Sequence, residues 1–433
     1  MLKARLVLFI YQLLTFFLAP LGMLYLIYKK RRDPPYGKRK WELLGFVPVS
    51  FRGSIWFHTV SVGEVIAARP IITAFAKRHP WLNIVVTTTT TTGAAQAAKI
   101  PGVTHLYAPL DSPTALYRFF KAVKPRQLFI METELWPNLL HRAQKERTQV
   151  TIFNARMPEH TCKAYEKHRA LIKALIADKL NLVICQTKED KERFIRIGVA
   201  PERLHVVNSL KYDLSPNEAK FAAGRAAKPH LQADIVLGAI STHEGEEALI
   251  LKSYQELRPA FPQLRLLIVP RHMSGVERIE SYAHSHHLTL SKRSQLQADL
   301  SDFPAAAGQI LIGDTLGEIE FYLGLCDVVF MGGSLVDIGG HNPLEPAYFA
   351  LPAITGPYYY NFAAQFDDLI AKEGAYLCPS AARLTPLLTR LLSNKAALSA
   401  AGLRALEVQQ AGRGALERTL NLLEQALKRQ ART

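Results

Sequence analysis

Short apolar runs alternate with amphipathic stretches along most of the chain after Trp41. The expected strands of a first series are Ile55–His58, Ile84–Thr87, Thr104–Tyr107, Leu128–Met131, Val150–Phe153, Leu182–Cys185 and His205–Val207. The stretches between them repeat apolar positions with the helical period, as Val65–Arg78 and Pro113–Val123 do. This alternation predicts a parallel sheet with helices on both faces.

A second series of the same kind follows a polar, Ala-rich stretch, Tyr212–Gln232, which contains Pro216, Gly224 and Pro229 and is interpreted as a linker. The expected strands of the second series are Ile235–Ala239, Leu264–Val269, Gln309–Gly313, Val328–Met331 and Pro352–Thr355. The expected fold class is therefore α/β, with two doubly wound, Rossmann-like domains facing a cleft and ligands at the carboxyl ends of the strands. The expected division is residues 1–40, 41–215, a linker at 216–232, and 233–433.

The N-terminus carries the longest apolar run, Leu6–Tyr28, which contains no charged residue. A helix of that length extends about 34 Å at about 1.5 Å per residue, enough to cross the hydrocarbon of a bilayer. A basic cluster, Lys29–Lys40, follows the run, and the bias of positive charge places the rest of the chain in the cytoplasm. Because Gln12, Pro20 and Gly22 interrupt the run, a helix lying in the membrane interface is the alternative to a spanning one.

Composition narrows the functional class. Lys and Arg total 53 against 37 Asp and Glu, a net charge of +16 that favours an anionic partner. The basic residues are dispersed and form no aromatic-interleaved stripe, which argues against a nucleic-acid partner. The four cysteines are far apart with no C-x-x-C pair, so neither a disulfide framework nor a cysteine zinc site is expected.

Several common motifs are absent. The chain has no P-loop, no G-x-G-x-x-G, no H-E-x-x-H and no D-x-D, the acidic pair that clamps a divalent metal in many nucleotide-sugar transferases. Glu132-Thr133-Glu134 is the nearest acidic pair. A metal there is an open alternative, but two carboxylates are too few to predict a metal site. No metal and no cofactor are included in the expected function.

Candidate catalytic groups lie at the expected strand ends of the first series. Glu64 opens a helix directly after the first strand, where burial would raise its pKa toward neutrality and make it a general base. The equally weighted alternative is a capping box with Ser61. Glu132, Glu134 and Trp136 follow the fourth strand as a possible pocket wall or as helix N-terminal acids. The threonines of Thr87–Thr92 are better explained as strand and cap than as ligand contacts.

The second series offers candidates for binding an anion. Ser241 and Thr242 lie between a strand and a helix, where backbone N–H groups favour negative charge, and Arg271 follows an apolar strand and could bind a phosphate bidentately. The densest signal is Gly332–Pro346, which combines four glycines with Ser334, His341, Asn342 and Glu345. Glycines let the backbone approach a ligand closely, and a carboxylate there could bind the hydroxyls of a ribose.

These motifs resemble the 3-deoxy-D-manno-octulosonate (Kdo) transferases of lipopolysaccharide assembly (lipid IVA Kdo transferases, glycosyltransferase family 30). The matching segments are SVGE at Ser61–Glu64, ETELWPN at Glu132–Asn138, NARM at Asn154–Met157, PRH at Pro270–His272, Gly317-Glu318 and GGSLVDIGGHNPLEP at Gly332–Pro346. Six motifs in order cover nearly the whole chain.

The resemblance implies a GT-B fold, CMP-Kdo as donor, a lipid A precursor as acceptor, and inverting, metal-independent transfer at the cytoplasmic face of the inner membrane. It makes Glu64 the proton acceptor and Glu134 and Lys211 transition-state stabilisers. The CMP site it implies comprises Arg271, His272, Leu316, Gly317, Glu318, Asn342, Pro343, Leu344 and Glu345, with Ser241, Thr242 and Ser334 as possible donor contacts.

Two other enzymes fit the same architecture: a GT-B transferase that uses a UDP-sugar and another lipid acceptor, and a nucleotide-sugar epimerase. The epimerase reading leaves the N-terminal apolar run unexplained. Stabilisation by CMP but not UDP would favour the Kdo reading over the UDP-sugar one.

Overall fold

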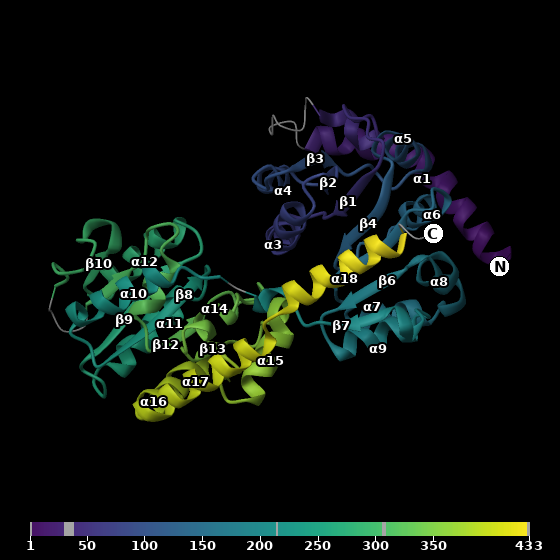
Figure 1. Cartoon of the computed structure of the whole chain (residues 1–433). Coiled ribbons are helices and arrows are strands. Elements are labelled where there is room, and N and C mark those ends of the chain that lie inside the picture. Colours follow the sequence, from purple (N-terminus) through teal and green to yellow (C-terminus); the bar gives the residue numbers. More distant parts are fainter. Residues whose placement is uncertain (1, 30–38, 214, 305–308, 431–433) are drawn as a thin grey trace. The chain divides into compact units, whose positions relative to one another are not determined.

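The computed structural model describes residues 2–29, 39–213, 215–304 and 309–430. It divides into two compact units, one formed by Met1–Asp213 together with Arg413–Thr433, and the other by Leu214–Gly412 (Figure 1). Each unit is built on one seven-stranded sheet, and every pairing in both sheets is parallel. The two doubly wound sheets expected from the hydrophobic pattern are confirmed.

The sheet of the first unit has the order β3-β2-β1-β4-β5-β6-β7. Its strands are β1 (Ser54–His58), β2 (Ile84–Thr88), β3 (Val103–Tyr107), β4 (Pro125–Met131), β5 (Gln149–Ala155), β6 (Leu182–Cys185) and β7 (Leu204–Val206). The order reverses beside β1, which is the position where open α/β sheets bind ligands beyond the carboxyl ends of their strands.

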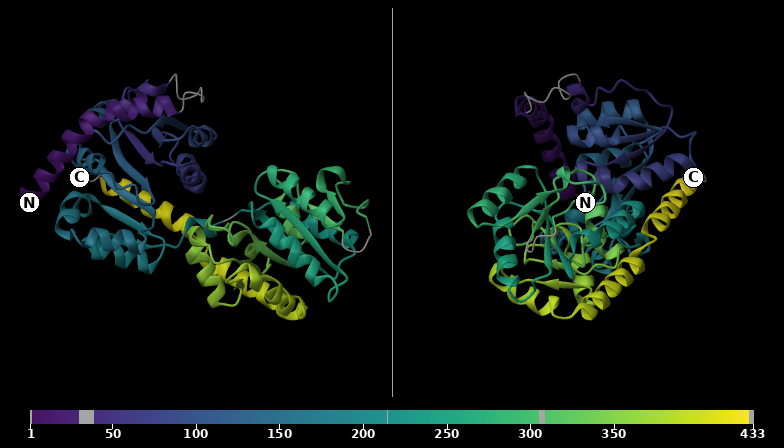
Figure 2. Two further views of the ribbon diagram at one scale, coloured as in Figure 1. Left: turned by 180° about the vertical axis from the view of Figure 1, so that it is seen from behind. Right: turned by 90° about the vertical axis from the view of Figure 1, so that its left-hand side faces the viewer.

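Helices cover both faces of this sheet (Figure 2). One face packs against α3 (Val62–Arg78), α4 (Thr91–Ala97) and α18 (Ala415–Gln430). The other packs against α5 (Pro113–Val123), α6 (Pro137–Lys145), α7 (Glu159–Glu166), α8 (Arg169–Leu175) and α9 (Lys188–Arg196). The N-terminal helix α1 (Leu2–Lys29) and the short helix η1 (Lys40–Leu44) complete the second of these layers.

The sheet of the second unit has the order β10-β11-β9-β8-β12-β13-β14. Its strands are β8 (Ile235–Thr242), β9 (Leu264–Pro270), β10 (Leu290–Lys292), β11 (Ile310–Ile312), β12 (Val328–Met331), β13 (Ala353–Thr355) and β14 (Ala375–Leu377). The helices of this unit are α10 (Glu218–Ala227), α11 (Glu247–Leu257), α12 (Ser274–Ser285), α13 (Ile319–Leu325), α14 (Leu344–Tyr348), α15 (Ala363–Ala371), α16 (Leu384–Leu392) and α17 (Lys395–Gly412). Leucines of α11 and α16 pack into its core.

The structure differs from the expected linker at 216–232. This stretch forms α10, which belongs to the second unit and packs on α13. Gly224 is the reason that the two helices approach so closely, because a Cβ atom there would lie 2.1 Å from the carbonyl oxygen of Phe321. An Ala-rich, Pro-containing sequence therefore gives a packed helix.

The structure also differs from the expected domain of residues 233–433 at its end. The chain returns to the first unit at Arg413, and Ala415, Leu420 and Leu423 of α18 are fully buried in the core on α3. Asp213 holds the return point, since its carboxylate accepts hydrogen bonds from the backbone N–H groups of Gly414 and Leu416.

Among the described residues, one helix, α1, has the length and the apolar composition needed to cross a membrane. Its candidate span is Leu2–Tyr25, with a mean hydropathy of 2.0. Most of the basic cluster expected to follow it, Lys30–Lys38, lies outside the described residues. Arg39 is described, and its guanidinium binds Glu42 and the carbonyl oxygen of His105.

Candidate functional site

Glu64 lies in the first turn of α3, immediately after β1. Ser61 is the N-cap of this helix: its hydroxyl accepts from the Glu64 backbone N–H (3.2 Å) and donates to Glu64 Oε1 (3.0 Å). The backbone N–H of Val60 donates to Glu64 Oε2 (3.0 Å). The capping arrangement predicted as the structural alternative is therefore present, and it fixes the direction of the carboxylate.

The capping hydrogen bonds do not account for the raised pKa of the Glu64 carboxyl group. Glu64 is 9% exposed, and its burial raises its pKa from 4.5 to about 7. The charges of Glu134 and Glu132 raise the pKa further, while the hydrogen bonds from Val60 and Ser61 oppose the shift. A carboxyl group poised near neutral pH has the property that a general base requires.

Glu134 and Glu132 lie on the loop between β4 and α6. Glu132 has a left-handed backbone (φ 56°), which is uncommon for a residue with a side chain and turns the chain sharply at the end of the strand. Glu134 accepts a hydrogen bond from the Trp136 indole (2.8 Å), and burial raises its pKa. The Trp136 ring lies 4.8 Å from that of His58, so the predicted pocket-wall tryptophan packs against the end of β1.

Lys211 belongs to the short helix η4 (Leu210–Tyr212). Asn154, at the end of β5, orients this helix by accepting the backbone N–H of Leu210 (3.2 Å). Burial lowers the pKa of Lys211; Arg156 lowers it further, and Glu132 acts in the opposite sense. The structure thus brings Lys211 together with Glu132 and Arg156, and Glu132 links this group electrostatically to Glu64.

The threonine run that begins at the end of β2 serves structural roles at three of its positions. Thr87 accepts from the Trp56 indole (2.8 Å) and contacts His58 Nδ1 (2.9 Å). Thr90 caps α4 by accepting the backbone N–H of Gly93 (3.0 Å), and Thr88 contacts His105 (2.9 Å). The strand-and-cap explanation of this run fits those contacts.

Glu246 organises the candidate site of the second unit. Its carboxylate is fully buried and accepts four backbone N–H groups, from His243 (3.0 Å), Gly333 (2.6 Å), Ser334 (3.0 Å) and Leu335 (2.9 Å). One carboxylate therefore fixes the loop after β12 to the loop after β8. The sequence analysis assigned no role to Glu246; the available signal was an acidic residue between β8 and a helix, beside a glycine-rich loop on the neighbouring strand.

The glycine-rich loop passes very close to the end of β8. A Cβ atom at Gly332 would lie 2.2 Å from the Ser241 carbonyl oxygen, and Gly333 has a left-handed backbone (φ 68°). Ser334 is fully buried, donates to the Met331 carbonyl (2.6 Å) and accepts from Gly356 N–H (2.8 Å), so these hydrogen bonds are internal to the unit. The glycines thus meet a packing requirement.

Ser241 and Thr242 end β8 beside this loop. Ser241 has a left-handed backbone (φ 59°) and is partly exposed. Thr242 is 1% exposed, and its hydroxyl has no hydrogen-bond partner within the part of the chain that the structure describes. Its carbonyl oxygen accepts the backbone N–H of Arg271 (2.9 Å), which joins the ends of β8 and β9.

Three histidines gather where these loops meet. The rings of His243 and His341 are stacked, with their Nε2 atoms 2.8 Å apart, and His272 packs edge-on against His243. Burial lowers the pKa of His341 to about 4, and nearby positive groups, Arg271 among them, add to the effect. His341 is therefore neutral at pH 7. The sequence analysis counted His341 in the glycine-rich segment but gave neither it nor His243 a role.

The predicted segment Asn342–Glu345 begins α14. The Asn342 side chain accepts the backbone N–H of Leu344 (3.1 Å) and donates to Glu345 Oε1 (3.3 Å). Burial raises the pKa of Glu345, and Arg271 opposes the shift, which places that exposed guanidinium within electrostatic reach of Glu345. Glu345 also lines a cavity of about 200 Å³ with Pro216, Glu320 and Phe349 among its other walls.

Residues 316–318 form the turn before α13. The Leu316 side chain is 89% exposed, and Gly317 has a left-handed backbone (φ 76°) with open space around its Cα. Glu318 binds the Thr315 hydroxyl and pairs with Arg293 (3.3 Å), so its carboxylate already has partners.

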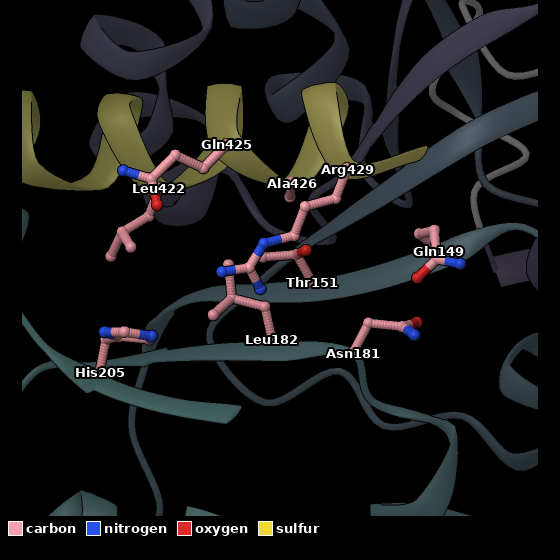
Figure 3. Close-up of a pocket in the computed structure, with 9 residues that line it drawn as sticks. All are labelled: Gln149, Thr151, Asn181, Leu182, His205, Leu422, Gln425, Ala426 and Arg429. Atoms are coloured by element: carbon pink, nitrogen blue, oxygen red, sulfur yellow. The ribbon is translucent and has the colours of Figure 1, made fainter. Parts of the chain in front are cut away.

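The predicted site residues therefore form two groups, one in each unit, and each group lies at the carboxyl edge of its own sheet. A cavity of about 230 Å³ lies at the opposite, amino edge of the first sheet, between α18 and the starts of β5, β6 and β7 (Figure 3). It contains none of the predicted residues. Among the described residues, no group of three His, Cys, Asp or Glu side chains could hold a metal ion.

Comparison with known proteins identifies the family. Residues 30–214 match the family model of 3-deoxy-D-manno-octulosonic-acid transferase (kdotransferase). The 3-deoxy-D-manno-octulosonic acid transferase of Haemophilus influenzae is 33% identical over 428 residues, covering 97% of this chain and 99% of the relative. That of Bordetella pertussis is 31% identical and covers 94% of this chain and 96% of the relative.

The solved structure of Acinetobacter baumannii MurG, at 12% identity, aligns with a TM-score of 0.53 over 87% of this chain and all of that one. This likeness supports the predicted GT-B-like fold. With the fold and the full-length relatives in agreement, the chain belongs to the family of 3-deoxy-D-manno-octulosonic acid transferases.

Proposed function

We propose that this protein transfers Kdo from CMP-Kdo to a hydroxyl group of a lipid A precursor at the cytoplasmic face of the inner membrane. Family membership supports the transferred sugar. The observation that carries the mechanism is the buried carboxyl group of Glu64, whose pKa is about 7 at the carboxyl edge of the first sheet.

In this mechanism Glu64 accepts the proton of the acceptor hydroxyl. The hydroxyl oxygen forms a bond to the anomeric carbon of Kdo, the bond from that carbon to the phosphate oxygen breaks, and CMP leaves with the electron pair. Attack from the face opposite the leaving group inverts the anomeric centre. Glu134 and Lys211 stabilise the charges that develop, and their shifted pKa values support this role because both groups are withdrawn from water.

The second unit binds the donor in this proposal. Arg271 and His272 bind the phosphate, and the Asn342–Glu345 segment binds the nucleoside together with Leu316, Gly317 and Glu318. Arg271 supports the assignment because it is a solvent-exposed cation whose field reaches His341 and Glu345. A guanidinium and backbone N–H groups can stabilise a departing monophosphate without a metal ion. Ser241 and Thr242 flank this group, whereas Ser334 contributes through the loop that it holds.

Membrane attachment through α1 completes the proposal. The window that qualifies α1 as a candidate span is only 11% buried, so its apolar surface is available to lipid. An enzyme held at the bilayer meets a lipid acceptor in two dimensions, which favours encounter.

Incubation of the purified full-length protein with CMP-Kdo and tetra-acylated lipid A precursor, followed by mass analysis of the lipid, tests this function. We expect the mass of the lipid to increase by Kdo, and we expect CMP but not UDP to raise the melting temperature. Transfer from a UDP-sugar but not from CMP-Kdo would overturn the proposal. Glu64→Gln provides the inactive control in the same assay.

A further inference from the structure

The N-terminal helix α1 packs along the first unit over most of its length. One stripe of its residues is withdrawn from solvent, at the spacing of a single helix face: Ala4, Leu8, Tyr11, Thr15, Ala19 and Met23. Leu8 joins the core beneath α5, α6 and α8, and Met23 packs with Leu43 and Tyr107 near the other end of the helix. The helix is therefore docked at both ends.

Two polar contacts fix the middle of α1. The Tyr11 hydroxyl donates to Asp111 Oδ2 (2.9 Å), and the Asn138 amide donates to the Thr15 hydroxyl (2.9 Å). Asp111 also accepts the backbone N–H groups of Asn138 (3.2 Å) and Leu139 (2.8 Å), which begin α6. A helix surrounded only by lipid would not form these hydrogen bonds, which pair Tyr11 and Thr15 with Asp111 and Asn138 of the first unit.

The elements under α1 are those of a water-soluble layer. The helix contacts η1, α5, α6 and α8 of the first unit. These elements carry charged residues, among them Lys121 on α5, Arg142 on α6 and Lys173 on α8. If α1 crossed the bilayer in this docked position, those charges would have to enter the hydrocarbon with it, which is strongly unfavourable.

Aromatic and basic residues lie on or beside two of the elements that α1 contacts. Trp41, Phe46 and Tyr117 are each about half exposed, on or beside η1 and α5. A cation lies over each ring: Lys40 over Trp41 (5.6 Å), Arg118 over Phe46 (4.4 Å) and Arg142 over Tyr117 (5.1 Å). The amphipathic Trp41 and Tyr117 rings and the neighbouring cations suit the level of anionic lipid headgroups.

From these contacts we propose that α1 lies in the plane of the membrane, within one leaflet, with its docked stripe on the protein and its remaining apolar surface in the acyl chains. This proposal rests on the membrane attachment included in the proposed function. The sequence leaves open whether this helix spans the membrane or lies in its interface. A helix docked on a layer of charged residues is compatible only with the in-plane arrangement.

The polar contacts of α1 also determine which part of the first unit faces the membrane. Asn138 begins α6 only a few residues after Glu134 and Trp136, on the loop at the carboxyl edge of the sheet. Anchoring α1 at Asn138 and Asp111 therefore brings the bilayer surface to the edge that carries Glu64 and Glu134. An acceptor hydroxyl at headgroup level would reach these carboxylates without the lipid leaving the membrane.

Fluorescence quenching by lipids with nitroxides at defined depths tests the orientation. The four native cysteines are buried, so a fluorophore can be directed to Leu6→Cys, Phe17→Cys or Leu24→Cys, which lie on the exposed side of α1. In vesicles containing anionic lipid we expect the same shallow depth at all three positions. Leu403→Cys, exposed on α17, should show no quenching and serves as the control.

The outcomes separate the two proposals. A Phe17 label about 10 Å deeper than labels at Leu6 and Leu24, near the bilayer centre, would establish a spanning helix and overturn the in-plane inference while leaving membrane attachment intact. Absence of vesicle binding would instead overturn the attachment itself.

A second measurement tests the polar contacts. In Ala19→Cys the thiol lies on the docked stripe, and we expect slow labelling. Adding Tyr11→Phe and Thr15→Val should speed its labelling at least several-fold, whereas adding Tyr28→Phe, an exposed tyrosine on the same helix, should leave it unchanged. Equal labelling rates in all three proteins would show that these hydrogen bonds do not hold the helix.

Discussion

The Ser61 hydroxyl donates a hydrogen bond to Glu64 Oε1 (3.0 Å) while accepting one from the Glu64 backbone N–H (3.2 Å). This reciprocal contact joins two roles that the sequence presented as alternatives. The cap anchors the carboxylate at the start of α3, and burial at the same place brings its pKa to about 7. A general base held in this way needs no reorganisation of its own side chain before it accepts a proton.

Replacing Glu64 by Gln removes the proposed base and keeps the size of the side chain. We expect kcat for Kdo transfer to fall by about 10²–10⁴-fold, with CMP affinity unchanged because the proposed nucleotide site is in the second unit. Kinetics with saturating CMP-Kdo and calorimetric CMP titration check the two statements. An active Glu64→Gln variant would remove Glu64 from the mechanism.

The pH profile should follow the ionisation of Glu64. Only the carboxylate accepts a proton, so activity should fall as the pH drops below about 7. Ser61→Ala removes a hydrogen bond that favours the carboxylate and should move this acidic limb to higher pH. A limb near pH 4.5 in the unsubstituted enzyme would contradict the assignment.

Glu64 should also make the folded protein less stable as the pH rises. Its pKa is about 7 when folded, against 4.5 for the unshifted group, so folding becomes less favourable as the pH rises from about 4.5 to about 7. The loss is at most about 3–4 kcal/mol, because one pKa unit corresponds to about 1.4 kcal/mol. Glu64→Gln should therefore raise the melting temperature at pH 8 relative to the unsubstituted protein and change it little at pH 4.5. Equal effects at both pH values would contradict this.

Glu246→Ala should disrupt the glycine-rich loop. Its four backbone donors would lose their partner, and each buried unpaired group costs about 1–3 kcal/mol before water enters. We expect a lower melting temperature and weaker CMP binding. Glu244→Ala is the matched control, since the Glu244 side chain is 84% exposed on the same loop. Unimpaired CMP binding by the Glu246 variant would show that the loop does not form the donor site.

Arg271→Gln should weaken CMP binding without destabilising the protein. A charged hydrogen bond to phosphate contributes about 1.5–3 kcal/mol, which corresponds to a loss of about 10–100-fold in affinity. Lys252→Gln, an exposed cation on α11, provides the control for net charge. An unchanged dissociation constant for CMP would remove Arg271 from the nucleotide site.

Leu423→Ala on α18 should destabilise the first unit by about 2–5 kcal/mol, because it leaves a cavity in a fully buried site. Leu403→Ala, on the neighbouring helix α17 but 58% exposed, should have little effect. Urea unfolding monitored by tryptophan fluorescence measures the difference, because all four tryptophans, Trp41, Trp56, Trp81 and Trp136, belong to the first unit. Equal stability of the two variants would show that α18 is dispensable for this core.

The periodic pattern predicted most of the fold because buried parallel strands are continuous apolar runs. All seven strands of the first sheet were expected close to their observed bounds. β10 and β14 at the two edges of the second sheet were not, since Leu290–Lys292 and Ala375–Leu377 have only three residues each and are only partly buried, which is too short for a periodic pattern. The pairing that forms them is set by the neighbouring strand.

The site was predictable where residues follow strands and not where distant segments meet. Glu64, Glu134 and Arg271 stand at strand ends, so the pattern located them. Glu246 is different, because three of the four N–H groups that it accepts belong to Gly333, Ser334 and Leu335, which are far away in sequence. The return of α18 to the first unit depends equally on long-range packing, which no local pattern encodes.

That return has a consequence for how the protein is made. The second unit is an uninterrupted segment of chain, Leu214–Gly412, inserted into the first, whose final helix is synthesised last. Since domains fold as units while the ribosome works from the N-terminus, the inserted unit can complete its core during translation. The unit that carries α1 and Glu64 must wait for Ala415, Leu420 and Leu423 to emerge. The nascent chain can thus complete its second unit before the unit that carries Glu64 has closed its core.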